Sequence, residues 1–430
     1  MDRLLVTGGA RLDGAVRVSG AKNSALKLMA GSVLAPGRTE LRNVPRIIDC
    51  SLMGKVLERL GVGVTWNAEG GVTIDATDVT SIEAPYELVR RMRASIVVLG
   101  PLLARCGRAR VAMPGGDEIG TRPIDLHLAG LERMGATIVL EHGFVQATAP
   151  HGLRGAVLTL DYPSVGATEN LMMAAVAARG TTVIDNAARE PEIADIAAFL
   201  AAVGARIDGA GTSTLEIEGV DAFAPTRFGV MPDRIEAGTW ATAAAATQGD
   251  VTIVDGRPEH LDLLLSKLAD AGADVSVTFD GLRVRQPVRP RAVDFVTLPY
   301  PGLATDFQPI LLAMLSVADG TSIATENVFE SRFLYVDELR RMGADIRTEG
   351  HHAVVRGVPR LSAAPVRAVD IRAGAAMVIA ALCGDGISEI ADVYHLDRGY
   401  EDLEAKLTGL GAEVRREGGA LLVPDPAETW

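Results

Sequence analysis

Two kinds of helical stretch alternate along this chain. Some stretches are apolar on nearly every side, among them residues 171–178, 241–246 and 375–382. Others, such as 131–134 and 337–342, mix charged residues with leucine and methionine. A helix that is apolar all round is buried on every side, whereas an amphipathic helix covers a core with one face. The pattern therefore predicts small-residue helices packed inside, with the remaining elements around them.

A repeated signature shows how often this arrangement recurs. In each copy a helix ends at a glycine, and a β-branched or similar residue starts a strand shortly afterwards, as expected for a glycine at the C′ position. Successive copies lie 68 to 74 residues apart. The glycines are Gly61, Gly135, Gly204, Gly272, Gly343 and Gly411.

A second signature runs out of phase with the first. Each apolar helix ends at a glycine that precedes a short strand, and these glycines lie 66 to 73 residues apart. They are Gly37, Gly107, Gly180, Gly249, Gly320 and Gly386. Two independent markers with nearly the same period indicate six copies of one unit, each with two helices and several strands. We therefore expect an α/β fold with helices inside and short sheets outside, the reverse of a TIM barrel, divided into two domains of three copies.

Length and composition fit this picture and limit the function. A chain of 430 residues is too long for one ordinary core. Its formal net charge of −13 disfavours a protein that grips a nucleic-acid backbone over its surface, so an anionic ligand needs a local basic pocket. No apolar run is long enough to span a membrane, and the first residues lack a signal-peptide pattern. The interpretation is a cytoplasmic globular protein, with no nucleic-acid or membrane partner.

Several common chemistries lack their motifs. The sequence has no dinucleotide-binding glycine fingerprint, no P-loop, no zincin motif, no Cys-x-x-Cys and no nucleophile elbow. Three cysteines, Cys50, Cys106 and Cys383, are too scattered for a disulfide framework or a zinc site. His351 and His352 are adjacent in a predicted strand, so they point to opposite faces and fit a surface better than a metal site.

A lysine opens the first apolar helix, in the sequence Ser-Gly-Ala-Lys-Asn-Ser at residues 19–24. A cation at the positive end of a helix is unfavourable unless an anion lies nearby, so Lys22 is a candidate anion ligand. A solvated lysine is the alternative.

A glycine-rich loop at residues 114–123 carries Asp117 and Arg122. A mobile loop of this kind with a titratable group is typical of an active-site lid. A plain acidic turn explains it equally well.

Acidic and basic residues also recur at one stage of the repeat, before the apolar helices. They are Asp233, Arg234, Arg332, Asp370, Arg372, Asp397 and Arg398. Arginine suits bidentate binding of carboxylate and phosphate, so these side chains would form a basic cleft if the helix N-termini face it. Ion pairing between the Asp and Arg residues is the structural alternative. Asp306, before the helix from Pro309, is similarly either a reactive carboxylate or an N-cap.

Taken together, the motifs resemble one family, the enolpyruvyl transferases that act as UDP-N-acetylglucosamine 1-carboxyvinyltransferases. The resemblance covers essentially the whole chain in order. The segments that carry it are 20–23, 93–95, 114–116, 120–127, 164–168, 188–192, 232–235 and 397–400.

The resemblance implies a two-domain inside-out α/β barrel built from six βαβαββ-type repeats. One domain would hold residues 22–231 and the other 1–21 with 232–430, with the active site in the cleft between them. The implied reaction moves the enolpyruvyl group of phosphoenolpyruvate to the 3-hydroxyl of UDP-N-acetylglucosamine and releases phosphate, at the first committed step of peptidoglycan synthesis. It needs no cofactor and no metal, and its partners are these two small molecules.

The resemblance also assigns roles to individual residues. Asp306 matches the base at the 3-hydroxyl, and Lys22, Arg122 and Arg398 match the positions that hold phosphoenolpyruvate. Those that match the substrate site more broadly are Asn23, Arg93, Arg122, Pro123, Ile124, Asp125, Leu126, Ser164, Val165, Gly166, Val328, Arg332 and Asp370.

One position departs from the family pattern. Most members have a cysteine directly after Pro-Gly-Gly, whereas this chain has Asp117, and its three cysteines lie in other repeat elements. An aspartate protonates C3 of phosphoenolpyruvate only if its pKa is raised, which a phosphate dianion and loop closure would favour. We therefore expect Asp117 to act as the acid, and the thiol-alkylating epoxide fosfomycin not to inactivate the protein.

Two other interpretations stay open at this stage. One is a transferase of the same fold that uses another nucleotide or sugar acceptor. The other is an inactive UDP-sugar-binding regulator, which the missing cysteine alone suggests.

Overall fold

The computed structural model describes residues 2–68 and 70–418, and the chain divides into two compact units. Unit one contains the chain up to Ser19, the short segment Glu118–Thr121 and the described chain from Pro232 onward. Unit two contains Gly20–Asp117 and Arg122–Met231. Each unit has its own core of buried apolar side chains, as expected of a separate domain.

Unit two contains three four-stranded sheets of one design. In each sheet an edge strand runs parallel to the second strand, and the remaining two strands follow antiparallel. The first sheet, in spatial order, is β14 (Arg227–Gly229), β3 (Arg38–Arg42), β5 (Gly71–Asp75) and β4 (Gly63–Asn67). The second is β6 (Glu83–Ala84), β7 (Arg108–Ala112), β9 (Phe144–Thr148) and β8 (Thr137–Glu141). The third is β10 (Val157–Thr159), β11 (Thr181–Asp185), β13 (Thr214–Glu218) and β12 (Arg206–Asp208).

Unit one repeats the same design three times within the described residues. Its first sheet is β2 (Asp13–Arg17), β15 (Asp250–Val254), β17 (Gly281–Arg285) and β16 (Asp274–Thr278). The second is β18 (Phe295–Val296), β19 (Thr321–Thr325), β21 (His352–Arg356) and β20 (Asp345–Glu349). The third is β23 (Pro365–Arg367), β25 (Ile387–Ala391), β1 (Arg3–Thr7) and β26 (Val414–Glu417), and a short pair joins β22 (Leu361–Ser362) to β24 (Gly384–Asp385).

Two strands that lie next to crossings between the units pair with strands far away in the sequence. Strand β2 lies directly before the first helix of unit two, yet it pairs in parallel with β15 of unit one. Strand β14 lies directly before α8, a helix of unit one, and it pairs in parallel with β3 of unit two. Each strand therefore holds the chain in a sheet just before it crosses to the other unit.

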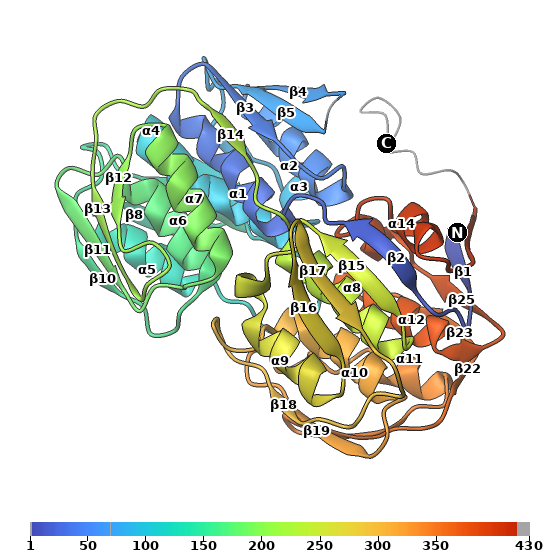
Figure 1. Ribbon diagram of the computed structural model, residues 1–430. Helices are drawn as coiled ribbons and strands as arrows, with labels where there is room; N and C mark the ends of the chain where they lie inside the picture. Colours follow the sequence, from blue (N-terminus) through green and yellow to red (C-terminus); the bar gives the residue numbers. More distant parts are fainter. Residues whose placement is uncertain (1, 69, 419–430) are drawn as a thin grey trace. The chain divides into compact units, whose positions relative to one another are not determined.

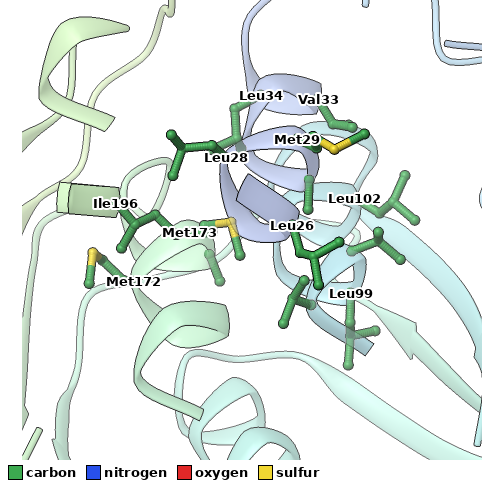
Figure 2. Close-up of a cluster of buried hydrophobic side chains, with 14 of the residues drawn as sticks. Leu26, Leu28, Met29, Val33, Leu34, Leu99, Leu102, Met172, Met173 and Ile196 are labelled. Atoms are coloured by element: carbon green, nitrogen blue, oxygen red, sulfur yellow. The ribbon is translucent and has the colours of Figure 1, made fainter. Parts of the chain in front are cut away.

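The inner helices are the apolar ones, as the sequence predicted. In unit one every residue of α8 (Arg234–Ala246), α10 (Gln308–Leu315) and α12 (Ile371–Leu382) is buried. In unit two the inner helices are α1 (Lys22–Gly31), α4 (Leu99–Cys106) and α6 (Val165–Ala175). Figure 2 shows leucine and methionine side chains from these helices in one cluster, together with Val33 and Leu34, which follow α1, and with Ile196. The predicted fold, buried helices within outer sheets, is confirmed (Figure 1).

The remaining helices are amphipathic or short. Helix α5, for example, buries Leu131 and His127 and exposes Glu132 and Arg133. These helices are α2 (Ile48–Arg59), α3 (Tyr86–Val89), α5 (Asp125–Arg133), α7 (Pro191–Ala202), α9 (Asp262–Asp270), α11 (Val336–Arg341), α13 (Tyr394–Asp397) and α14 (Leu403–Gly409). The 3-10 turns are η1 (Ser32–Leu34), η2 (Arg93–Val98), η3 (Pro258–His260) and η4 (Thr305–Phe307).

The marker glycines behave as the repeat required, with one exception. All six of the first set have positive φ, between 85° and 114°, and so do five of the second set. In the fourth repeat the left-handed residue is Gln248, with φ of 54°, and not Gly249. Within the described residues, no helix combines the length and the apolarity needed to cross a membrane.

Candidate functional site

Lys22 is buried at the start of α1, and the solvated alternative is wrong. Its side chain is 8% exposed, and its Nζ lies 2.7 Å from Oδ2 of Asp49 on α2, a carboxylate that is 1% exposed. Asp49 therefore supplies a negative charge beside this lysine at the helix N-terminus. The next residue, Asn23, is half-buried.

Two arginines of unit two, Arg93 and Arg122, lie close together against the Pro-Gly-Gly turn at residues 114–116. Burial and the neighbouring Arg122 lower the pKa of Arg93 to about 10. A Cβ atom at Gly116 would lie 3.0 Å from Nη2 of Arg122 and 3.1 Å from Cβ of Arg93, and Gly116 has φ of 117°. Glycine at this position therefore lets the turn pack on both side chains. Half-buried neighbouring guanidinium groups favour an anionic ligand.

The loop that carries Asp117 has no regular structure over 113–124. Nη2 of Arg122 donates to the backbone oxygen of Asp117 at 2.8 Å. The next segment belongs to unit one, where the N–H and the hydroxyl of Thr121 donate to Oε1 of Glu330 at 2.6 and 2.7 Å. These bonds lower the pKa of Glu330. The loop is thus held at the carbonyl of Asp117 and, four residues later, at Thr121.

The predicted sugar-binding segment is the start of α6. Ser164 is its N-cap, and Oγ accepts from the N–H of Ala167 at 3.3 Å. Val165 and Gly166 are half-buried in the first turn. Helix N-termini of this kind bind anions through free backbone N–H groups. In the neighbouring segment Pro123 and Asp125 are exposed, Leu126 is half-buried and Ile124 is buried.

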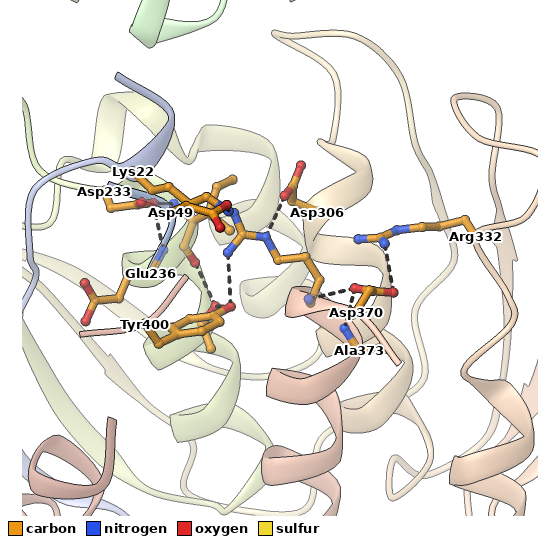
Figure 3. Close-up of polar contacts among 12 residues, drawn as sticks. Lys22, Asp49, Asp233, Glu236, Asp306, Arg332, Asp370, Ala373 and Tyr400 are labelled. Atoms are coloured by element: carbon orange, nitrogen blue, oxygen red, sulfur yellow. Dashed lines mark hydrogen bonds and ion pairs between the residues drawn. The ribbon is translucent and has the colours of Figure 1, made fainter. Parts of the chain in front are cut away.

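In unit one, Asp306 pairs with an arginine and does not cap a helix. Oδ1 of Asp306 accepts from Nε of Arg372 at 2.6 Å, and the 3-10 turn at Asp306 has no side-chain cap (Figure 3). Burial would raise the pKa of Asp306, but nearby guanidinium groups outweigh it and lower the pKa to about 2. These groups belong to Arg372, Arg332 and Arg234.

Asp370 holds two arginines in place, which supports the structural alternative of Asp–Arg pairing at this position. Its Oδ1 caps α12 by accepting from the N–H groups of Arg372 at 2.8 Å and Ala373 at 2.9 Å. Its Oδ2 lies 3.3 Å from Nη1 of Arg332 (Figure 3). The Nε of Arg332 is buried and has no hydrogen-bond partner among the described residues. An unmet buried donor is costly, and an incoming acceptor would satisfy it.

Arg398 is 5% exposed and follows α13. Its neighbour Asp397 pairs with Arg416, at 2.6 Å from Oδ1 to Nη2. Two residues further on, the hydroxyl of Tyr400 lies 3.4 Å from Nη1 of Arg372. The segment after α13 therefore reaches the Asp306 group through Tyr400. Asp233 caps α8, and the guanidinium of Arg234 lies 5.6 Å from the Tyr300 ring centre.

The sequence did not single out Glu326, which ties two predicted site residues together. Its carboxylate accepts from Val328 N at 2.7 Å and from the hydroxyl of Thr305, next to Asp306, at 2.9 Å. Glu330 was also missed as a loop contact, and Arg372 was given no role by the resemblance. In the sequence, Glu326 lies two residues before Val328, a predicted binding residue, and this spacing could have pointed to it.

The comparisons with known proteins agree with the sequence resemblance. A family model described as EPSP synthase (3-phosphoshikimate 1-carboxyvinyltransferase) matches residues 6–407. The UDP-N-acetylglucosamine 1-carboxyvinyltransferase of Nocardia farcinica is 56% identical over 97% of this chain and 99% of that protein. The protein of the same name from Mycobacterium tuberculosis is 53% identical over 96% of this chain and 99% of that protein.

Solved structures show the same fold. The enolpyruvyl transferase NikO from Streptomyces tendae matches with a TM-score of 0.87 at 28% identity, over 97% of this chain and 99% of that one. An EPSP synthase from Acinetobacter baumannii matches with a TM-score of 0.77 at 18% identity, over 97% and 100%, which supports the fold alone. The resemblance inferred from the motifs is confirmed, and the chain belongs to the EPSP synthase family of enolpyruvyl transferases.

Proposed function

We propose that the chain transfers the enolpyruvyl group of phosphoenolpyruvate to the 3-hydroxyl of UDP-N-acetylglucosamine and releases phosphate. Relatives that carry this activity in their names are 52–56% identical over nearly the full length of the chain. The reaction would be the first committed step of peptidoglycan synthesis, in the cytoplasm, and so would contribute to cell-wall growth, cell shape and division. It requires no metal or cofactor.

The observation that carries the proposal is the surroundings of Asp306. One carboxylate, 33% exposed at its side chain, lies beside Arg372 and within the field of Arg332 and Arg234, which are 3% and 7% exposed. Several guanidinium groups gathered around one partly exposed carboxylate suit a substrate with several negative charges. Phosphoenolpyruvate carries a carboxylate and a phosphate.

Asp306 would act as the base that takes the proton from the 3-hydroxyl. A carboxylate with a pKa near 2 is a weak base, so its ion pair with Arg372 must loosen first. A substrate anion that accepts from Arg372 competes with Asp306 for this guanidinium and thereby raises the pKa of Asp306. The base would then become active only when the phosphorylated substrate is bound.

The chemistry would proceed by addition and elimination. The 3-oxygen bonds to C2 of phosphoenolpyruvate while a proton adds to C3, which gives a tetrahedral intermediate. Loss of a proton from C3 restores the double bond as the C2–O bond to phosphate breaks. Lys22, Arg122 and Arg398 would balance the charges of the carboxylate and the phosphate.

Asp117 would supply the proton to C3. Arg122 donates to the backbone carbonyl of Asp117, and Glu330 accepts from Thr121 four residues later. The cysteines give little support for thiol chemistry: burial raises the pKa of Cys383 to about 12 and also raises that of Cys106, and Cys50 is fully buried. Thiol-directed epoxides such as fosfomycin would therefore lack a reactive thiolate.

The nucleotide sugar would be bound mainly by residues of unit two. Ser164, Val165 and Gly166 would present the N-terminus of α6 to its phosphates, with Arg93 and Arg122 adding charge. The other binding residues proposed from the resemblance are Asn23, Pro123, Ile124, Asp125, Leu126, Val328, Arg332 and Asp370. We assign Asp370 the supporting role of fixing Arg332.

Phosphate release in the presence of phosphoenolpyruvate tests the proposal across a panel of acceptors. We expect release with UDP-N-acetylglucosamine and none with UDP-glucose, uridine or shikimate 3-phosphate. Release with another acceptor alone would favour the transferase of different specificity. Binding of UDP-N-acetylglucosamine without any release would favour an inactive regulator. Asp306→Asn serves as the matched control, because it keeps the size of the side chain and removes the base.

A further inference from the structure

A buried histidine beside the predicted nucleotide-sugar site has its protonation pattern fixed by its neighbours. His127 lies on α5 and is 5% exposed. Nδ2 of Asn170, on α6, lies 3.0 Å from Nδ1 of His127. Which of these nitrogens carries the hydrogen follows from the other bonds of Asn170.

Asn170 can be oriented in only one way. Its Oδ1 accepts from the backbone N–H of Gly100 at 2.7 Å, and its Nδ2 faces the carbonyl of Ile96 at 3.4 Å. A backbone N–H only donates and a carbonyl only accepts, so the Asn170 NH₂ group is the one that faces His127. A Cβ at Gly100 would come within 2.6 Å of Oδ1 of Asn170, so glycine permits this approach.

The ring of His127 therefore accepts at Nδ1 and, when neutral, carries its proton on Nε2. Burial and the charge of Arg93 lower the pKa of His127 to about 4, against the opposing effect of Asp125. The ring is thus neutral near pH 7. Its Nε2–H group has no hydrogen-bond partner among the described residues.

This donor faces the first turn of α6. A Cβ atom at Gly166 would lie 3.3 Å from both Cε1 and Nε2 of His127. The first N–H groups of a helix have no partner inside the helix and attract anions. An unpaired side-chain donor and unpaired backbone donors thus meet at one point, within the field of Arg93.

We propose that His127 binds the nucleotide sugar directly, by donating its Nε2–H to the diphosphate at the N-terminus of α6. This inference rests on the proposed function, because it takes a nucleoside diphosphate as the ligand. Because the ring is neutral, its Nε2–H group would orient the diphosphate through a hydrogen bond without placing a third positive charge beside Arg93 and Arg122. Asn170 is the positioning residue, since it fixes the ring orientation and the tautomer.

Two substitutions separate the nitrogens of His127. His127→Asn keeps an acceptor near the position of Nδ1 and removes the distal donor, whereas His127→Gln keeps an amide N–H near the position of Nε2. Calorimetric titration with UDP-N-acetylglucosamine should show about 10- to 100-fold weaker binding for H127N, the loss of one hydrogen bond to a charged group. H127Q should stay within about threefold of the wild type.

The ligand series locates the contact. UDP should lose affinity for H127N as strongly as UDP-N-acetylglucosamine does, whereas uridine, without phosphates, should bind both proteins equally. An equal loss for uridine would overturn the proposal, as would wild-type affinity of H127N for UDP. Thermal unfolding of the variants shows whether the fold is intact.

Nuclear magnetic resonance of the wild-type imidazole nitrogens tests the proposal without any variant. We expect the Nε2–H tautomer at pH 7, and a shift of Nε2 on addition of UDP. An Nδ1–H tautomer, or a ring that does not respond to UDP, would overturn it. Phosphate release by the wild type separates the two hypotheses: if release is normal while H127N binds UDP as the wild type does, only the histidine contact fails.

Discussion

An ion pair buried in the core of unit two leads to a prediction about stability. Lys27 on α1 and Glu169 on α6 lie 3.4 Å apart from Nζ to Oε2, with side chains 9% and 1% exposed. Neither carboxylate oxygen of Glu169 has a hydrogen-bond partner among the described residues. Burial raises the pKa of Glu169 to about 7; Lys27 opposes this effect, and Glu192 and Glu190 add to it.

The sign and size of the effect follow from proton linkage. The pKa of Glu169 in the native protein lies above its unfolded value near 4.5, so the native state binds the proton more tightly. This contribution is fully present below pH 4.5 and is lost as the pH rises through about 7. A shift of this size corresponds to about 3 kcal/mol, because each pKa unit is about 1.4 kcal/mol.

Glu169→Gln removes this titration while keeping the shape of the side chain. At pH 5 both proteins have a neutral group beside Lys27, so their free energies of unfolding should be nearly equal. At pH 8 the variant should be more stable by up to about 3 kcal/mol, since the wild type must keep a buried carboxylate that is poorly hydrogen-bonded. Urea unfolding followed by circular dichroism between pH 5 and 8 measures the difference. Glu216→Gln, at an exposed carboxylate of β13, is the matched control and should show no trend.

A wild type that gains stability over E169Q as the pH rises would refute this reasoning. It would mean that Glu169 is ionised throughout and that its pairing with Lys27 outweighs the cost of burial. A difference that stays constant with pH would refute it as well.

Three further predictions concern the active site. Asp306→Asn should lower kcat by about 10²- to 10⁴-fold with little change in the Kd of UDP-N-acetylglucosamine, the effect of losing a general base; unchanged kcat in a phosphate-release assay would exclude that role. Fosfomycin should leave the wild type active and inactivate Asp117→Cys, and stoichiometric labelling of Asp117 in the wild type would contradict this. Thr121→Val should loosen the loop by removing the hydroxyl bond to Glu330, which limited proteolysis at 113–123 detects as several-fold faster cleavage; an unchanged cleavage rate would show that this bond does not hold the loop.

The repeat made most of the fold predictable from the sequence. Helix-ending glycines with positive φ leave a periodic trace, because few other residues adopt that conformation cheaply. The all-apolar helices likewise identified the inner layer. The strand partners of β2 and β14 could not be derived from the repeat, since strand pairing depends on contacts between segments about 190 to 240 residues apart; it was the family resemblance that grouped residues 1–21 with 232–430. Nothing local in either strand records its partner.

Candidate site residues such as Lys22, Arg122 and Asp306 could be proposed from side-chain type together with the family resemblance. Their partners were not, because a carboxylate such as Asp49 looks like any helix-start acid until the fold brings it to the lysine. Capping at Asp306 was the simpler interpretation of the sequence, yet Arg372, 66 residues away, takes that carboxylate. The tautomer of His127 depends on residues of four elements at once and has no sequence signature.

The most direct test of the account is a crystal structure with UDP-N-acetylglucosamine and an unreactive analogue of phosphoenolpyruvate. We predict that the 3-hydroxyl lies within hydrogen-bond distance of Asp306, that Lys22, Arg122 and Arg398 contact the analogue, and that the diphosphate lies at the start of α6. A sugar bound away from Asp306, or an analogue that contacts none of these three cations, would contradict the account.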